Sequence, residues 1–424
     1  MLYREPEKEI PVIGEYDVIV AGSGPSGMAA AVRAGRMGCR VLLVECCGRV
    51  GGISTSGLMS HFTGRCDSRL YREILQRAAD HNPYETGVSR VQIDPELMTV
   101  TYLEMLQEAK VELLLYTLVC GVMMEGERLC GIITESKSGR QAYRAKVVID
   151  CTGDGDVAAK SGASYYMGRE SDGKMQPATL MFKVGGVDMA RASLPESFET
   201  KVETEKGELQ ALALEKLPHP AGHVLLYKSP LPGIVTCNMT NVTDIDGTRA
   251  EDLTRAEQVC RSQMEPIVRF LREYVPGYEN CYIISAASLM GVRETRHFRG
   301  EYTLTEEDIL AARQFENWVV RDAHFNFDVH NLTGASLDKT GCQHGFKQSL
   351  GYTIPYGCLL PEKIDGLLLS GRNISGTHMA HSNFRVMPIC VGIGEAGGVA
   401  ASLAVKKGIL PREVRAEEIQ TYLQ

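Results

Sequence analysis

The sequence lacks several features that would place it in a familiar functional class. None of its thirteen cysteines forms a CxxC pair, so neither a cysteine metal clamp nor a paired-thiol redox site is predicted. No uninterrupted apolar run reaches about 18 residues, so no membrane span is expected. The net charge is −8, and no Lys/Arg cluster interleaved with aromatic residues forms the basic footprint of a nucleic-acid-binding protein.

The same absences bear on location and partners. The N-terminal segment, MLYREPEKEIPVIGEYD, has acidic residues and no apolar h-region, so a secretory signal is not predicted. Scattered unpaired thiols are typical of a reducing compartment, and a cytoplasmic location is therefore expected. A chain of 424 residues can form two or three domains. The expected partners are small molecules or proteins, with no nucleic acid and no membrane, and the oligomeric state stays open.

The segment Glu15–Glu45 predicts a βαβ unit. Asp17–Ala21 is apolar enough for a buried parallel strand, Pro25–Met37 is a helix-like run of small residues, and Arg40–Glu45 is a second strand that ends in an acid. About thirty residues is the usual length of such a unit. The pattern predicts an α/β domain that binds a dinucleotide.

Three glycines, Gly22, Gly24 and Gly27, stand where the first strand passes into the helix. The first permits the tight turn, the second lets a pyrophosphate approach the backbone, and the third lets the helix pack on the strand. The pyrophosphate would accept hydrogen bonds from the N–H groups at the helix N-terminus. Glu45, twenty-three positions after Gly22, is placed to accept from a ribose hydroxyl.

A second match to the same glycine spacing occurs at Gly392, Gly394 and Gly397. It follows Met387-Pro388-Ile389-Cys390 instead of a long strand, and no acid lies at the right distance. Because context decides such matches, this copy is not predicted to be an independent site. The chain is therefore expected to hold one dinucleotide.

Two further segments are expected beside the ligand. Gly51 and Gly52 follow the acid of the second strand, and the small hydroxyl residues around Thr55 could run along a ribityl chain and a flat ring. Ala145–Asp150 predicts a buried strand that ends in the glycine- and acid-rich turn Cys151–Asp156. Open α/β sheets bind their ligands at this carboxyl edge.

The character of the chain changes between about Pro177 and Gly345. Acid- and proline-containing stretches alternate there with strand-like runs and one long helix, predicted from Leu253 to Tyr274. This predicts an inserted domain that covers the first, and it holds the densest group of fixed cations, GVRETRHFRG at 291–300. Beyond it, Gly366–Ser370 predicts a buried strand, and a small-residue helix follows Pro388.

Six motifs belong together: EYDVIVAGSGPSGMAAA, GGISTSGL, VVIDCTGDGDVA, GVRETRHFRGEYTLTEEDI, IPYGCLLP and LLLSGRNISGTHMAHSNFRVMPICVGIGEAGGVAASLA. In combination, over about residues 16–405, they resemble the FAD-dependent oxidoreductase family grouped with the flavoprotein domain of heterodisulfide reductase. The flavoproteins of fumarate reductase and succinate dehydrogenase are more distantly similar. The resemblance implies FAD as the cofactor and an α/β fold: an FAD/NAD(P)-binding Rossmann-like domain of the glutathione-reductase type with an inserted α+β substrate or cap domain.

The resemblance also implies a division of the chain and a set of cofactor contacts. The division is an N-terminal extension (1–15), the first part of the FAD-binding domain (16–176), the inserted domain (177–345), the return segment of the FAD-binding domain (346–410) and a C-terminal tail (411–424). The implied cofactor contacts are Gly22, Ser23, Gly24, Pro25, Ser26, Gly27, Glu45, Gly51, Gly52, Thr55, Val119, Gly153, Asp154, Gly371, Arg372, Arg385 and Gly394.

The sequence departs from the family pattern in two respects. Arg372 stands where many related flavoproteins have an aspartate, after the glycine of the final strand. The multi-cysteine runs that bind iron–sulfur clusters are absent, so that chemistry is not carried over.

Arg293 is the first candidate catalytic residue. Its forked guanidinium could fix a substrate carboxylate, or it could belong to a salt-bridged turn with Glu294 and Glu301, and both interpretations stay open. Among the other arginines of this motif, Arg299 fits the salt-bridged turn better.

Four histidines are the other catalytic candidates. His61 lies in a loop expected to pass the flavin ring, where it could carry a proton, tether the flavin, or be an ordinary hydrogen-bonded loop histidine. His344, His378 and His381 are expected closer to the ring, because the resemblance places their segment there. No metal site is predicted, since His378 and His381 are accompanied by neither an HExxH motif nor a third ligand.

The predicted function is that of an enzyme, an FAD-dependent oxidoreductase. It would move a hydride or electrons between the flavin N5 and a small organic substrate, carboxylated or not. With one dinucleotide site, the flavin would exchange electrons directly with the substrate and with a redox partner or diffusible acceptor. The alternative is a flavoprotein electron-transfer subunit that works only with a partner redox protein. The intact glycines argue against a third hypothesis, a binding protein with a vestigial fold.

Overall fold

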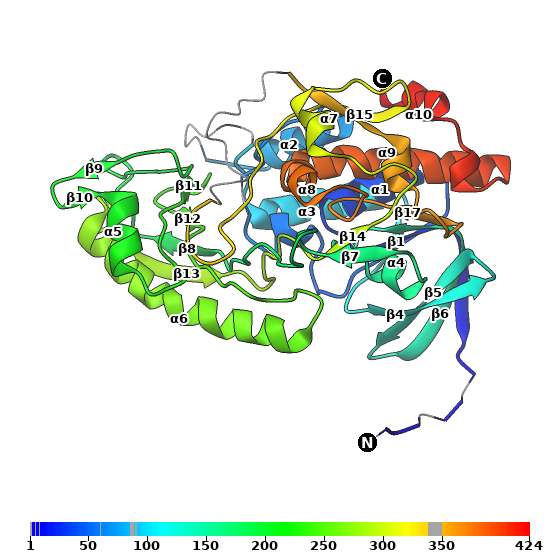
Figure 1. Cartoon of the computed structure of the whole chain (residues 1–424), viewed down its shortest axis with the longest axis horizontal. Helices are drawn as coiled ribbons and strands as arrows, with labels where there is room; N and C mark the ends of the chain where they lie inside the picture. The colour runs from blue at the N-terminus through cyan, green and yellow to red at the C-terminus, as the bar shows by residue number, and fades with distance from the viewer. Residues whose placement is uncertain are drawn as a thin grey trace.

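The computed structural model describes residues 2–4, 6–7, 9–59, 61–84, 89, 91–337 and 350–424. Figure 1 shows two parts side by side: one contains the blue N-terminal strands and the red C-terminal helices, and the other contains the green strands and helices. Each part has its own cluster of buried apolar side chains. Both ends of the chain therefore build one part, and its middle builds the other.

The first part is built on a sheet with the strand order β3-β2-β1-β6-β5-β4, and β17 adds beside β6. The pairs β1–β2, β1–β6, β2–β3 and β6–β17 are parallel, whereas β4, β5 and β6 form an antiparallel ribbon. The strands are β1 (Val12–Ala21), β2 (Val41–Val44), β3 (Glu112–Leu114), β4 (Leu118–Glu125), β5 (Arg128–Ser136), β6 (Gly139–Asp150) and β17 (Leu367–Leu369). This parallel arrangement confirms the predicted α/β class and its βαβ unit.

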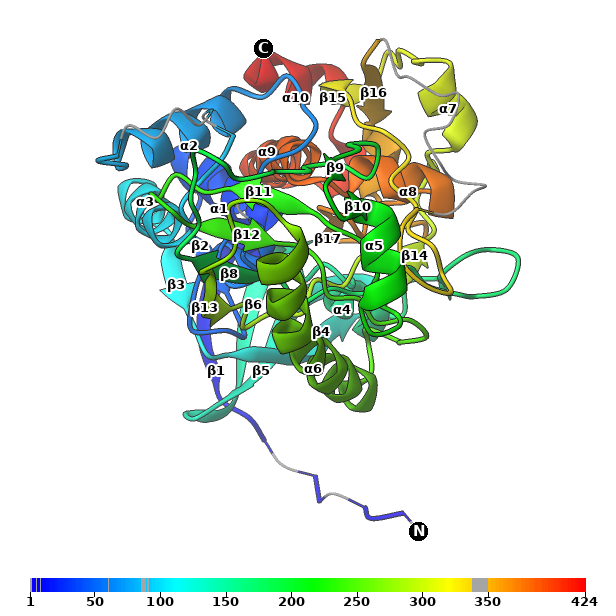
Figure 2. The same ribbon diagram turned by 90° about the vertical axis from the view of Figure 1, so that its left-hand side faces the viewer.

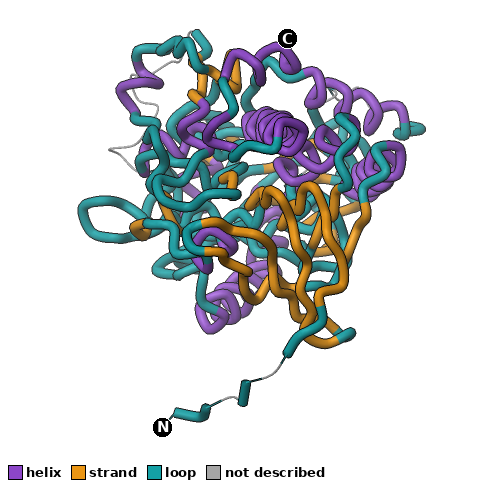
Figure 3. Tube along the Cα trace, turned by 90° about the vertical axis from the view of Figure 1, so that its right-hand side faces the viewer, coloured by secondary structure: helices purple, strands orange, loops and turns teal. Residues whose placement is uncertain are grey.

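Helices cover this sheet, and Figure 3 shows the strands gathered below a layer of helices. They include α1 (Pro25–Arg36), α2 (Arg69–Asp80), α3 (Pro95–Glu108) and α9 (Met387–Lys407). Side chains cap two of them, since Ser68 accepts from the N–H of Tyr71 and Asp94 accepts from that of Glu96. By length and composition α9 could cross a membrane, but 94% of its apolar window is buried inside the protein, as in a core helix.

The backbones of α1 and α9 lie in close contact because glycines face the contact. A Cβ atom added to Gly394 would stand 2.0 Å from the carbonyl oxygen of Ser26, and one on Gly398 would stand 2.6 Å from that of Ala30. The second glycine motif therefore lies inside a buried helix and serves helix packing, as its sequence context predicts.

The second part contains an antiparallel sheet with the order β11-β12-β8-β13, seen at the front of Figure 2. Its strands are β8 (Phe182–Gly185), β11 (Leu226–Lys228), β12 (Val235–Cys237) and β13 (Tyr282–Ala286). The helices α5 (Leu209–Lys216) and α6 (Ala250–Tyr274) flank it, and α6 ends at the residue predicted for the long helix. The predicted boundary at 345 lies outside the described residues, so the division into domains stays a prediction.

Short elements complete the structure. The strands β7 (Tyr165–Met167) and β14 (Arg296–Phe298), far apart in the sequence, pair in an antiparallel manner and lie close to α8 (His378–Phe384) in Figure 1. The remaining described elements are η1 (Gly52–Ser54), α4 (Asp156–Lys160), β9 (Glu203–Thr204), β10 (Gly207–Glu208), α7 (Glu306–Leu310), β15 (Trp318–Ala323), β16 (Tyr352–Pro355), η2 (Tyr356–Leu359), η3 (Pro411–Glu413) and α10 (Ala416–Leu423).

The contact between α1 and α9 predicts opposite effects for two glycines of one helix. Gly394→Ala forces the helices apart, and such overpacking costs about 1–3 kcal/mol, so the thermal unfolding midpoint should fall. Gly397→Ala is the matched control, because its Cβ would meet only ordinary contacts at 3.5 Å or more. Replacing a glycine inside a helix with alanine usually raises the free energy of unfolding by about 0.5–1 kcal/mol, so the unfolding midpoint of Gly397→Ala should rise. Equal midpoints for the two variants would contradict the packing described here.

Candidate active site

A cleft of about 680 Å³ lies at the carboxyl edge of the main sheet and extends toward the second part. One end is formed by the β1–α1 turn, the end of β2 and the turn after β6. The other end is formed by side chains of the second part and of the segment around 325–330. The lining includes Gly22, Ser23, Gly24, Pro25, Ser26, Glu45, Gly52, Val119, Gly153, Asp154, Tyr227, Arg293, Asp328, His330, Gly371, Arg372 and Arg385.

The β1–α1 turn leaves backbone open to the cleft. Gly22 has a φ of +92°, and a Cβ there would stand 2.5 Å from the carbonyl oxygen of Cys151, so the turn requires glycine. Around Gly24 no atom lies within 4 Å of an added Cβ, and this residue caps α1 without a side-chain hydrogen bond. The N-terminal N–H groups of α1 are thus free to bind an anion such as a pyrophosphate.

Glu45 is held in a fixed orientation at the end of β2. Its Oε2 accepts from the backbone N–H of Ser23 (2.8 Å) and from Ser23 Oγ (2.7 Å), and its Oε1 accepts from the N–H of Cys47 (2.8 Å) and from Cys46 Sγ (3.3 Å). A carboxylate has about four acceptor positions. The two backbone donors hold the group in place, and ribose hydroxyls could replace the two side-chain donors.

Four of the predicted cofactor residues support the walls instead of lining the cleft. Gly27 and Gly394 are packing glycines, Gly51 donates its N–H to the carbonyl of Ser23 (2.8 Å), and the Thr55 hydroxyl donates to the carbonyl of Val50 (2.5 Å). Direct contacts of these four with a cofactor stay predictions.

Arg372 forms an ion pair with Asp154 in the lining of the cleft. Its Nη2 donates to Asp154 Oδ1 (2.7 Å), which also accepts from the Thr295 hydroxyl (2.7 Å). Gly153 is left-handed, with a φ of +83°, and a Cβ there would stand 2.7 Å from Arg372 Nη1. The guanidinium therefore lies flat against the turn after β6. Thr295 is a site residue that the sequence analysis missed, although it belongs to the cation-rich motif.

Arg293, Arg385 and Asp328 form a cluster of charged side chains at the far end of the cleft. Arg385 Nη2 donates to Asp328 Oδ2 (2.9 Å), and His330 Nε2 lies 3.4 Å from the same oxygen. Arg293 is 8% exposed and donates to the carbonyl of Pro177 (2.6 Å). The salt-bridged turn with Glu294 and Glu301 is not formed by Arg293 within the described residues.

The charges of this group follow from its burial. Burial and the Arg293 guanidinium lower the pKa of His330 to about 4, and burial lowers that of His223 to about 3, so both are neutral near pH 7. Burial alone would raise the pKa of Asp328, but His330 and Arg385 hold it well below its usual range. Burial lowers the pKa of Arg293 to about 10, which leaves it charged. Arg293, Arg385 and Asp328 together therefore carry one surplus positive charge, and the exposed carboxylates of Glu196 and Glu199 also line the cleft.

Tyr227 is the main hydroxyl at this end. It accepts from Asn238 Nδ2 (3.1 Å), and burial raises its pKa to about 12, so it keeps its proton. The ring of His61 packs edge-on against Tyr227 with centroids 5.6 Å apart, and burial lowers the pKa of His61. His61 therefore lies behind the cleft wall, with Tyr227 between its ring and the cleft.

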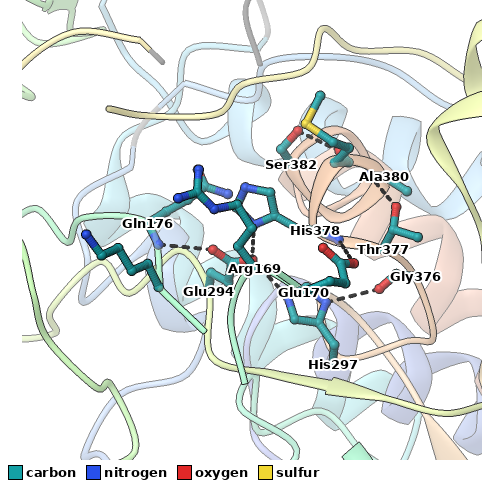
Figure 4. A network of polar contacts seen from close by, with 12 residues as sticks. Arg169, Glu170, Gln176, Glu294, His297, Gly376, Thr377, His378, Ala380 and Ser382 are labelled. Carbon is teal, nitrogen blue, oxygen red and sulfur yellow. Dashed lines mark hydrogen bonds and ion pairs between the residues drawn. The ribbon is translucent and has the colours of Figure 1, made fainter. Parts of the chain in front are cut away.

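His378 and His381 do not line the cleft. They lie behind it in a buried polar cluster with Glu294 and His297, shown in Figure 4 for all but His381. Although burial alone would raise it, the hydrogen bonds from His297 and His378 hold the pKa of Glu294 well below its usual range. Burial and the nearby His297 lower the pKa of His381 far below its usual value. His344 lies outside the described residues.

Several buried polar atoms along the cleft have no hydrogen-bond partner within the part of the chain that is described. They include Arg372 Nε, Arg385 Nε, Thr179 Oγ1 and Asn238 Oδ1. Such atoms are costly unless a ligand satisfies them. Together with the bare N-terminus of α1 and the oriented Glu45, they fit a long dinucleotide with a polar substrate at its far end.

Comparisons with known proteins agree with this geometry. The sequence model of the family described as FAD dependent oxidoreductase matches residues 17–423. The tRNA uridine 5-carboxymethylaminomethyl modification enzyme MnmG of Streptococcus pneumoniae (strain Hungary19A-6) is 27% identical over 177 residues, 36% of this chain and 27% of MnmG. Digeranylgeranylglycerophospholipid reductase 1 of Methanococcoides burtonii is 25% identical over 200 residues, 42% of this chain and 47% of the reductase. The matched regions thus span less than half of these curated relatives.

A solved structure supports the fold. The geranylgeranyl bacteriochlorophyll reductase-like protein from Thermoplasma acidophilum superposes with a TM-score of 0.51 at 12% identity, covering 96% of this chain and 82% of that one. At this identity the likeness concerns the fold alone.

The orientation of Glu45 predicts the effect of one substitution on FAD affinity. In Glu45→Gln an amide NH₂ must face the backbone N–H of Ser23 or of Cys47, and a charged acceptor is lost. Hydrogen bonds to charged groups contribute about 1.5–3 kcal/mol, so FAD affinity measured by equilibrium dialysis should fall about 10- to 100-fold. Glu112→Gln is the control, because Glu112 bonds Tyr16 and Arg40 outside the cleft. An unchanged affinity in Glu45→Gln would remove Glu45 from the site.

Proposed function

The chain belongs to the FAD dependent oxidoreductase family, and from that premise we propose that it oxidises or reduces a small carboxylated organic substrate at the flavin N5. The observation that carries the proposal is a pair of arginines at the end of the cleft opposite Glu45: Arg293, which is 8% exposed, and Arg385, whose side chain is 13% exposed. Arginine binds carboxylates through a planar fork of donors, and burial strengthens the interaction.

The electrostatics of the far end favour an anion. Asp328 neutralises one of the two arginines through its ion pair with Arg385. His330 and His223 are neutral near pH 7 and add no charge. A bound carboxylate would therefore neutralise Arg293, the arginine without a carboxylate partner among the described residues, whereas the carboxylates of Glu196 and Glu199 in the cleft lining are exposed to solvent.

The residues present suit FAD at the other end. When bound, the flavin supplies the hydride or electron acceptor at N5, and the protein supplies position and charge. The N–H groups at the start of α1 would bind the pyrophosphate, and Glu45 would accept from the ribose. The segment Gly371–Arg372 and the start of α9 would lie along the ribityl chain and the ring, where the N-terminal end of α9 favours negative charge.

The proton that accompanies hydride transfer needs a carrier near the substrate. Tyr227 keeps its proton at neutral pH and accepts its hydrogen bond from Asn238, so its own O–H can donate to a substrate oxygen. His330, neutral and adjacent to Asp328, can accept a proton. We assign Tyr227 the role of donor in place of His61, which lies behind it.

We also propose that this chain groups, within the family, with the flavoprotein domain of heterodisulfide reductase. It is supported by the motif set of the sequence and by the family match. A flavoprotein that only transfers electrons to or from a partner protein remains the alternative function, and the two differ in whether a small molecule alone reduces the flavin.

A matched pair of probes tests the carboxylate site. Small α-hydroxy and α-amino carboxylates should perturb the flavin absorption of the purified protein, and the corresponding carboxamides should bind about 10- to 100-fold more weakly, as expected for the loss of a charged hydrogen bond. Arg293→Gln should abolish the preference for the carboxylate while the FAD content stays normal. Arg299→Gln is the control, because Arg299 belongs to the same motif but is exposed. A preference that survives Arg293→Gln would overturn the assignment.

A further inference from the structure

The polar cluster behind the cleft brings two imidazoles onto one carboxylate oxygen, as Figure 4 shows. Glu294 Oε1 lies 2.8 Å from His297 Nε2 and 2.6 Å from His378 Nδ1. The side chains of Glu294, His297 and His378 are 0%, 1% and 4% exposed. Glu294 precedes β14, His297 lies within it, and His378 begins α8. Two segments far apart in the sequence thus place three ligand-type atoms at one buried point.

We propose that Glu294, His297 and His378 form a binding site for one divalent transition-metal ion of the zinc type. Two imidazole nitrogens and one carboxylate oxygen are a donor set that such ions take, and the three atoms lie within 4.8 Å of one another. Bonds of about 2.1 Å in a tetrahedron separate the ligand atoms by about 3.4 Å. Each nitrogen therefore withdraws from Oε1 by about 0.6–0.8 Å from its present 2.8 or 2.6 Å, which side-chain rotation supplies.

The atoms around the three ligands already form the outer contacts of a metal site. His297 Nδ1 lies 3.0 Å from the carbonyl oxygen of Gly376, so its N–H donates there and Nε2 faces the ion. Glu294 Oε2 accepts from the N–H of Gln176 (3.0 Å), which leaves Oε1 as the ligand atom. A histidine ligand that donates its other N–H to a carbonyl, and a hydrogen-bonded carboxylate, are the usual partners that orient metal ligands.

A bound ion would take the place of the two hydrogen bonds that now join Glu294 Oε1 to His297 Nε2 and His378 Nδ1. With two neutral imidazoles and one carboxylate as ligands, a divalent ion keeps one positive charge. Glu170, which accepts from the backbone N–H of His378 (2.9 Å), supplies a carboxylate beside it.

A second observation points to a ligand at this place. His381 is 2% exposed, its Nδ1 has no hydrogen-bond partner among the described residues, and its ring centroid lies 5.0 Å from that of His297. Three protein ligands leave a fourth position open in a tetrahedral site. A water can complete it, and the unpartnered Nδ1 of His381 is the polar atom beside the cluster that such a water could bond.

The ion would join the two segments that carry the arginines of the cleft. Arg293 directly precedes Glu294, and Arg385 is the C-terminal cap residue of α8, which begins at His378. The site therefore has a positioning role toward the cleft. It does not depend on the substrate proposed above.

The test uses the FAD-loaded protein after treatment with a chelator, titrated with Zn²⁺ alone and with Co²⁺ alone. We expect one ion per chain with micromolar or tighter affinity, measured by calorimetry, and a higher thermal midpoint. The Co²⁺-loaded minus metal-free difference spectrum should show tetrahedral d–d bands without thiolate charge transfer. Thiolate bands would move the ion to Cys46 and Cys47 beside Glu45, the other metal-type cluster of the described chain, and would overturn the proposal.

Variants identify the ligands. His378→Gln and Glu294→Gln should each weaken Zn²⁺ binding at least 100-fold with the FAD content retained. His81→Gln is the matched control, because His81 pairs with Glu104 at 2.9 Å on the surface and should leave binding unchanged. Unchanged binding in His378→Gln, or no uptake by the wild-type protein, would overturn the proposal. If a variant loses its FAD, the stoichiometry and the Co²⁺ spectrum of the wild-type protein decide.

Discussion

The close contact between α1 and α9 is the constraint on which the rest of the site depends. Gly394 lies against the carbonyl of Ser26, so the two backbones touch with no side chain between them. This contact brings the C-terminal segment back over the first βα turn. As a result the open N-terminus of α1, the turn after β6 and Arg372 all face one cleft. A larger residue at the contact would separate the parts of the site that the sequence holds hundreds of positions apart.

The cleft then divides its chemistry between its two ends. One end offers backbone N–H groups and an oriented carboxylate, which suit a dinucleotide. The other end offers the guanidinium groups of Arg293 and Arg385, of which only Arg385 is paired with Asp328, so Arg293 can bind an anion. Burial enforces this division, because it keeps His330 and His223 neutral and leaves the arginines as the charged groups. The buried cluster of Glu294, His297 and His378 ties together the segments that present those arginines.

Much of the fold could be predicted because its signals are local. The βαβ unit and the end of α6 each follow from residues within one turn or one strand. The site contacts are not local: Arg372 meets Asp154 across 218 positions and Glu294 meets His378 across 84. Residue spacing in the sequence does not predict contacts between such distant residues. The structure was therefore needed to show that Arg372 pairs with Asp154 and that Glu294 lies beside His378. Thr55 and Gly394 were predicted as cofactor contacts from their motifs. In the structure they support the walls of the cleft and do not line it.

The central claim, that the cleft holds FAD and that a small carboxylate exchanges electrons with it directly, is tested by one spectrum. The purified protein should be yellow, its colour should pass into the supernatant on acid precipitation, and one small carboxylate of a panel should bleach the flavin under nitrogen without any partner protein. A colourless protein that takes up no added FAD would contradict the account of the cleft. A flavin that only a partner protein can reduce would contradict the proposed function and establish the electron-transfer alternative.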